Sequence, residues 1–273
     1  MMSEIRKADS FHFRVNPFED DFTGRLSWSV LGKHVLACAE NHAAARGFDR
    51  LTLNGRRFLW VLSRMAFEMQ EWPHRGEEYV ITTWIRNYYR YFTDRCFDIC
   101  RSDGKLLGRV FTIWAMIDEE SRKPQVLEGL FGHTFDPYID AERPCISQPF
   151  SRIRMREEAA PCCRRTTYFS DIDENNHVNS IRYIEFLLDT FPKPLLESRD
   201  VSRLEIAYHS ESYCGDSLSF YAQGDAGDGP VQMQVRKNAG ADPAQGETVC
   251  HALISFAPPR QAEVPSSERI INL

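Results

Sequence analysis

The order of periodic segments limits the possible folds of this chain more than any other feature. Residues 30–46 have the apolar spacing of a helix, and Gly47 follows as a stop signal. Four strand-like segments come next, at residues 58–67, 78–86, 95–100 and 106–118. A helix followed by antiparallel strands can bury its apolar face if the sheet wraps around it. The pattern predicts an α+β fold.

The same order of segments recurs in the second half of the chain. Residues 177–190 form a second helical pattern, and strand-like segments follow at 203–208, 217–223, 231–237 and 248–257. The turn Arg75-Gly76-Glu77 is echoed by Cys214-Gly215-Asp216, each just before a strand-like segment. This predicts an internal repeat, although a generic α+β domain would also fit.

A segment rich in proline separates the two patterns. Residues 136–161 contain Pro137, Pro144, Pro149 and Pro161 and few periodic apolar residues, as is typical of a linker. We therefore expect repeats at residues 1–137 and 160–273, joined by a linker at residues 138–159.

Composition excludes several classes of protein. The formal net charge of −6 argues against a nucleic-acid-binding protein, which would usually be basic. The chain has no apolar run long enough to insert into a membrane, and its first residues lack the apolar core of a signal peptide. We therefore expect a cytoplasmic protein.

The eight cysteines are expected to be free thiols, because the cytosol is reducing. Cys96 and Cys100 have no second pair at metal-ligand spacing, so no metal site is expected. The chain also lacks the G-x-S-x-G, P-loop and H-E-x-x-H motifs of other hydrolases and nucleotide-binding proteins.

Polar residues crowd the start of the second predicted helix. These are Asp171, Asp173, Asn175, Asn176 and His177. Asp and Asn are preferred as helix caps, but one cap needs only one such residue. The surplus, which ends in a histidine, is what a hydrolytic site would require.

The run from Asp171 to Tyr183 resembles the D-x-D-x-N-x-H-V-N-x-x-x-Y signature of plant-type and bacterial acyl carrier protein (ACP) thioesterases. Further similarity, at residues 60–65, 73–84, 114–117 and 235–238, extends it from about residue 10 to about residue 257. The resemblance implies a tandem hot-dog fold, in which each repeat wraps an antiparallel sheet around a central helix. It also implies that the first repeat receives the acyl chain and the second catalyses hydrolysis, without a cofactor.

Transferred residue by residue, the resemblance assigns catalysis to Asp173, Asn175, His177 and Glu211. Many plant members have a cysteine after this glutamate, whereas this chain has Ser212. A water mechanism agrees with the chemistry of thioesters, whose thiol leaving group needs little protonation. We expect His177 and Glu211 to activate water and Asn175 to orient the water or the carbonyl oxygen. Asp173 and the backbone N–H groups at the helix start would assist.

Two binding surfaces are expected from the same resemblance. Val61, Met65 and Phe67 are candidates for contact with the acyl chain. Arg152, Arg154 and Arg156 are candidates for docking the acidic carrier protein, because a basic patch steers such a partner. A second basic cluster, Arg56, Arg57 and Arg64, is the alternative.

Other functions stay open on the sequence alone. A hot-dog thioesterase acting on acyl-coenzyme A, a non-catalytic acyl-binding module and a hydratase are the alternatives. The polar set around His177 argues against a simple binding module, which has no need for it. Acyl chain length and the choice between monomer and homodimer cannot be read from the sequence.

Overall fold

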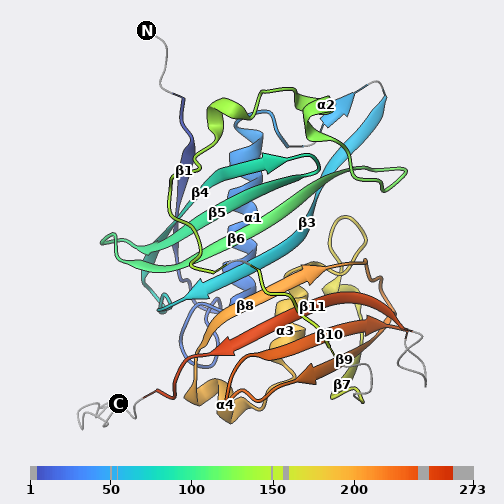
Figure 1. Cartoon of the computed structure of the whole chain (residues 1–273). Coiled ribbons are helices and arrows are strands. Elements are labelled where there is room, and N and C mark those ends of the chain that lie inside the picture. Colours follow the sequence, from blue (N-terminus) through green and yellow to red (C-terminus); the bar gives the residue numbers. More distant parts are fainter. Residues whose placement is uncertain are drawn as a thin grey trace.

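The structure, a computed structural model, is built around one continuous antiparallel sheet. It describes residues 5–49, 51–53, 55–148, 150–155, 160–238 and 246–260. Within these ranges the sheet runs in the order β1-β4-β5-β6-β3-β8-β11-β10-β9-β7, and β2 pairs with β3. The two main helices, α1 and α3, lie against the same side of the sheet (Figure 1). We call the opposite side the outer face.

Up to residue 118, the described part of the chain forms one helix and six strands. The elements are β1 (Ala8–Arg14), α1 (Trp28–Ala44), β2 (Leu51–Leu53), β3 (Arg56–Met69), β4 (Glu78–Tyr89), β5 (Phe92–Arg101) and β6 (Leu106–Asp118). The side chain of Ser27 caps α1 by accepting a hydrogen bond from the N–H of Val30. The predicted helix and four strands are confirmed, whereas β1 and β2 were not predicted.

The second half repeats this arrangement. Its elements are β7 (Cys163–Thr166), η2 (Phe169–Asp171), α3 (Arg182–Leu188), α4 (Lys193–Ser198), β8 (Val201–Tyr208), β9 (Ser217–Gln223), β10 (Val231–Lys237) and β11 (Glu247–Phe256). The strand order β1-β4-β5-β6-β3 of the first half recurs as β7-β9-β10-β11-β8. Gly76 and Gly215 both have positive φ, at the matching turns before β4 and β9. The expected tandem hot-dog fold is confirmed.

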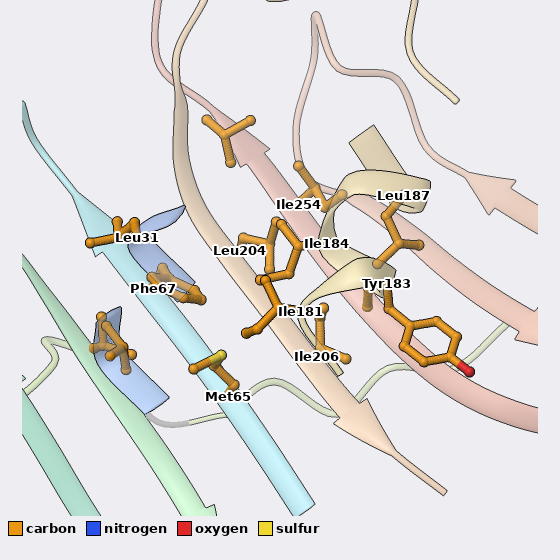
Figure 2. Packing of buried hydrophobic residues seen from close by; sticks show 14 of the residues in the cluster. Leu31, Met65, Phe67, Ile181, Tyr183, Ile184, Leu187, Leu204, Ile206 and Ile254 are labelled. Atoms are coloured by element: carbon orange, nitrogen blue, oxygen red, sulfur yellow. The ribbon is translucent and has the colours of Figure 1, made fainter. Parts of the chain in front are cut away.

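The two halves share a core as well as a sheet. Strands β3 and β8 pair antiparallel, with Met65 opposite Ile206 and Phe67 opposite Leu204. These four side chains point to the helix side of the sheet, where Ile181 joins them (Figure 2). A Cβ atom at Gly32 would lie 2.8 Å from the Cδ1 atom of Ile181. A larger residue at position 32 would therefore force the Ile181 side chain to move, where α1 approaches the second half.

The second predicted helix is shorter than expected. The prediction covered residues 177–190, but α3 begins only at Arg182. Asn176 has a φ of 64°, in the left-handed region, and the side chain of Asn179 accepts a hydrogen bond from the N–H of Ile181. Asp and Asn side chains that bond to nearby backbone groups compete with helix formation. Residues 172–181 consequently form a loop, although their apolar residues are spaced as in a helix.

The segment between the halves begins with two short helices, α2 (Leu127–Phe131) and η1 (Asp136–Tyr138), and then crosses the outer face of the sheet (Figure 1). Two buried carboxylates hold it there. Glu68 accepts hydrogen bonds from the backbone and hydroxyl of Ser147, and Glu205 accepts the same pair from Ser151. Arg203 pairs with both carboxylates. This segment is therefore fixed to the sheet, unlike a freely flexible linker.

The expectation that all cysteines are free thiols is wrong. Cys96 on β5 forms a disulfide with Cys145 of the segment that crosses the outer face. The other six cysteines are free. The two partners are 49 residues apart in the sequence, and a pairing across such a distance depends on how the chain folds back. The fold sets Cys96 among Trp84, Phe111 and Phe150 on the outer face.

Candidate functional site

The structure brings together two of the four predicted catalytic residues. The Nε2 atom of His177, in the loop before α3, lies 3.2 Å from the Oε2 atom of Glu211, just after β8. Both side chains are accessible, with 22% and 36% of their surface exposed. The ring of Tyr213 packs edge-on against His177, with the ring centroids 5.1 Å apart. A histidine and a carboxylate at this distance can share and relay a proton from water.

Asp173 organises the loop that carries His177. Its Oδ1 atom accepts hydrogen bonds from the backbone N–H groups of Asn175, at 2.9 Å, and His177, at 3.4 Å. Its own N–H donates to the carbonyl oxygen of His177 at 2.9 Å. The isolated bridge between Ile172 and Val178 closes the base of this turn. The Asp173 carboxylate thus holds the turn by accepting hydrogen bonds from its backbone N–H groups.

Asn175 lies on the same turn as an exposed side chain. Its amide makes no hydrogen bond to any residue within the described ranges, so it is available to a ligand. The backbone N–H groups of Asn175, Asn176, His177, Val178 and Asn179 all donate within the protein. The expected help from these N–H groups is therefore not supported, since they are occupied and the helix starts later. The exposed amide of Asn175 is a donor on this turn that makes no bond to the described part of the protein.

Asp171 is a structural residue. It is 1% exposed, and its Oδ1 atom lies 2.8 Å from a guanidinium nitrogen of Arg182 in the first turn of α3. Its Oδ2 atom accepts the N–H of Tyr168 at 2.9 Å. Asp171 therefore anchors the loop to the helix, and part of the polar surplus seen in the sequence serves the fold.

Ser212 follows Glu211 but is closed off from solvent, with 0% of its surface exposed. Its carbonyl oxygen accepts the N–H of Val178 at 2.8 Å, which joins the two loops of the site. A substrate thioester cannot reach a side chain in this position without a rearrangement of the loops. This geometry favours water over Ser212 as the nucleophile.

Two cationic residues at the site were missed in the sequence analysis. The guanidinium of Arg122 pairs with the Oε1 atom of Glu211, and the Nζ atom of Lys237 donates to the carbonyl oxygen of Glu211 at 2.5 Å. Arg122 belongs to the first half and gave no local signal beyond its position after a predicted strand. Lys237 lies within the stretch of residues 235–238 that carried the resemblance.

The three predicted acyl-chain residues do not share one face of β3. A bulge lies between Leu62 and Arg64, so that Val61 is opposite Ala115 while Met65 is opposite Thr112. Side chains alternate along a strand, so positions 112 and 115 of β6 point to opposite faces. Val61 consequently points to the outer face, whereas Met65 and Phe67 point inward and are fully buried.

The predicted carrier-docking residues lie on the segment that crosses the outer face. Arg152 and Arg154 are exposed, and the N–H of Arg154 donates to the side chain of Gln232 on β10. Arg156 lies outside the described residues. Gln232 is five residues from Lys237, which is about 17 Å along a strand. Arg152 and Arg154 are thus well separated from the His177 and Glu211 pair.

A cavity of about 380 Å³ lies at the other end of β8, around Val201. It is lined by apolar residues such as Trp28, Trp72 and Phe191 and by ion-paired residues such as Arg25 and Asp200. None of the predicted catalytic residues lines it.

Among the described residues, no three His, Cys, Asp or Glu side chains gather closely enough to hold a metal ion. No helix in the described ranges is long and apolar enough to cross a membrane.

Comparison with known proteins identifies the family of the chain. Residues 8–130 match the acyl-ACP thioesterase N-terminal domain, and residues 158–256 match the acyl-ACP thioesterase C-terminal domain. The palmitoyl-acyl carrier protein thioesterase of Gossypium hirsutum is 24% identical over 216 residues, which are 76% of this chain and 52% of that protein. The dodecanoyl-[acyl-carrier-protein] hydrolase of Cinnamomum camphora is 25% identical over 215 residues, 73% of this chain and 55% of that protein. The chain thus spans about half the length of these curated relatives.

Two solved structures cover nearly the whole chain. The crystal structure of an acyl-ACP thioesterase from Bacteroides thetaiotaomicron has a TM-score of 0.82 and 42% sequence identity, over 94% of this chain and all of that one. The 12:0-ACP thioesterase from Umbellularia californica has a TM-score of 0.79 and 17% identity, over 94% and 99% of the two chains, and so supports the fold alone. With both family domains matched in order, the chain belongs to the acyl-ACP thioesterase family.

Proposed function

We propose that this protein hydrolyses fatty acyl-ACP thioesters to a free fatty acid and the carrier thiol. The observation that carries this proposal is that His177, on the loop that bears the family signature, pairs with Glu211 at 3.2 Å. Family membership indicates the class of substrate, and the accessible pair supplies the general base that hydrolysis needs.

In this mechanism His177 removes a proton from a water molecule, whose oxygen attacks the carbonyl carbon of the thioester. Glu211 holds the imidazole and stabilises its protonated form. The exposed amide of Asn175 donates a hydrogen bond to the oxyanion that develops on the carbonyl oxygen. Collapse of the tetrahedral intermediate breaks the C–S bond, and the carrier leaves as a thiolate that takes up the proton. Asp173 keeps Asn175 and His177 in place through their backbone N–H groups.

The reaction is tested by measuring free thiol released from a panel of ACP and coenzyme A thioesters of graded chain length. The expected result is faster hydrolysis of the ACP esters, at a rate that His177→Ala lowers by about 10² to 10⁴-fold. A preference for coenzyme A esters would favour the alternative thioesterase, and binding without turnover of any ester would favour a non-catalytic acyl-binding module.

We further propose that the two repeats divide the work, with the acyl chain in residues 1–137 and catalysis in residues 160–273. Met65 and Phe67 point into the core of the first repeat next to the shared β3 and β8 pair, which supports their contact with the chain. Val61 is left out of this proposal because it points to the outer face. Met65→Ala or Phe67→Ala should shift the preferred chain length, and an unchanged profile in both variants would place the chain elsewhere.

We propose that Arg152 and Arg154, together with Arg156, attract the acidic carrier protein. Reversing all three charges should raise KM for ACP thioesters and spare small soluble thioesters, and the difference should shrink at high salt. The matched comparison reverses the alternative cluster, Arg56, Arg57 and Arg64. If only this second variant raises KM, the carrier docks on that cluster instead.

The location and assembly of the protein belong to the same proposal. The expected cytoplasmic location is tested by fractionating cells that contain the protein. Monomer and homodimer are distinguished by light scattering of the purified chain.

A further inference from the structure

The carboxylate of Glu211 is shared between the two repeats. Its Oε2 atom faces His177 of the second repeat, while its Oε1 atom pairs with the guanidinium of Arg122 from the first repeat. The three side chains therefore form a continuous chain of contacts across the boundary between the repeats. Arg122 lies in the turn that follows β6.

The turn that contains Arg122 is stabilised by hydrogen bonds to Asp118. Asp118, which is 3% exposed, accepts hydrogen bonds from the N–H of Ser121 at 2.8 Å and from its hydroxyl at 2.7 Å. Together with the guanidinium of Arg56, these bonds keep the pKa of Asp118 below its usual value, because each stabilises the charged carboxylate. The N–H of Arg122 donates to the carbonyl oxygen of Asp118 at 2.9 Å.

The backbone of Arg122 has an uncommon conformation. Its φ is 58°, in the left-handed region that residues with side chains seldom adopt. A strained residue of this kind persists only where its surroundings fix it, and such residues cluster at functional sites. Here the fixed backbone directs the Arg122 side chain toward the second repeat.

We propose that Arg122 is a positioning residue for Glu211, so that the first repeat completes the catalytic site of the second. The inference rests on the proposed hydrolysis. By occupying Oε1, Arg122 leaves Oε2 directed at Nε2 of His177, while Lys237 donates to the backbone carbonyl oxygen of Glu211. Without Arg122, a glutamate side chain that is 36% exposed would sample several rotamers, and the pairing with His177 would be lost part of the time.

The effect should appear in the rate rather than in stability. The Arg122 side chain is 40% exposed, and ion pairs this accessible contribute little to folding because solvent screens them. Misplacement of a catalytic group by about 1 Å, in contrast, can lower the rate by about 10²-fold.

The test measures kcat and KM for Arg122→Ala, Arg122→Gln and Arg122→Lys, each with an ACP thioester and a small soluble thioester. We expect Arg122→Ala and Arg122→Gln to lower kcat by about 10- to 100-fold for both substrates, with KM nearly unchanged. Arg122→Lys should recover part of the rate, since it retains the charge. Adding Arg122→Ala to Glu211→Ala should cause no further loss, because the two residues act as one unit.

A matched control is Arg101→Ala, which removes an arginine paired with Asp103 in another turn of the first repeat. Its kinetics should equal those of the wild type. A rise in KM confined to the ACP substrate would make Arg122 a carrier contact and overturn the inference. Additive losses of rate in the double variant would also overturn it. If the wild type is active and the Arg122 variants are equally active, the inference is overturned but the proposed function stands. A wild type inactive on every thioester would instead refute the function itself.

Discussion

The N–H of Val178 donates to the carbonyl oxygen of Ser212 at 2.8 Å and ties the loop before α3 to the segment after β8. Val178 directly follows His177, and Ser212 directly follows Glu211. One backbone hydrogen bond therefore fixes the two candidate catalytic side chains next to each other. Ser212 itself lies in the interior, where its surface is fully covered.

This arrangement predicts opposite outcomes for neighbouring residues. His177→Ala and Glu211→Ala should each lower kcat by about 10² to 10⁴-fold, because general-base assistance is lost. Ser212→Ala should keep most of the activity, since its side chain does not reach the substrate. Thiol release under saturating substrate gives all three rates.

Intact-protein mass spectrometry during turnover provides the independent check on Ser212. A water mechanism predicts no added acyl mass on the wild-type protein. An acyl adduct at Ser212, together with an inactive Ser212→Ala variant, would rule the water mechanism out.

The turn that carries His177 makes a second prediction. Asp173→Asn keeps a side-chain oxygen that can accept from the N–H groups of Asn175 and His177, whereas Asp173→Ala removes it. The asparagine variant should therefore retain more activity than the alanine variant. If both are equally inactive while still folded, the charge of Asp173 matters in its own right.

Asn175→Ala should lower kcat by about 10² to 10³-fold, the usual effect of losing one donor to an oxyanion. KM should change little, because the oxyanion develops mainly in the transition state. The matched comparison is Asn176→Gly at the neighbouring position of positive φ, which should preserve the rate.

Stability should fall in acid because of a buried histidine. Burial, with Arg95 and Arg46 nearby, lowers the pKa of His42 from 6.5 to about 3. Between these values the unfolded chain binds a proton at His42 that the folded protein does not. The stability that comes from keeping His42 neutral in the folded protein is fully present above pH 6.5. The free energy of unfolding then decreases as the pH falls toward 3, by up to about 1.4 kcal/mol per pH unit.

Urea unfolding between pH 7 and pH 4 measures this slope. His42→Gln should flatten it, whereas His133→Gln, at an exposed position, should leave it unchanged. His34, His209 and His251, whose pKa values are also lowered by burial, contribute in the same direction and remain in both variants. An equal slope in wild type and His42→Gln would contradict the assignment.

The disulfide between Cys96 and Cys145 predicts a thiol count. Denatured protein kept without reductant should show six reactive thiols, and eight after reduction. Cys145→Ser should abolish this difference, with seven thiols in both conditions. Eight thiols in the unreduced wild type would show that the bond does not form.

The sequence alone determined most of the secondary structure and pointed to the candidate catalytic loop. The strands at 106–118, 217–223 and 231–237 coincide with β6, β9 and β10 as the structure has them. Alternating apolar residues report burial of one face of a strand, which is a local property and can be read locally. The cluster from Asp171 to His177 was equally visible, because it consists of consecutive residues.

The tertiary structure decided what depends on contacts between distant residues. The start of α3 moved to Arg182 because side-chain bonds in the preceding loop outcompete the helix, and the bulge beside Leu62 turned Val61 to the outer face. The disulfide of Cys96 with Cys145 and the pairing of Arg122 with Glu211 join segments that only the folded sheet brings together. Sequence patterns record how each segment buries its own surface. They do not record which distant segment covers it, because that depends on the packing of the whole chain.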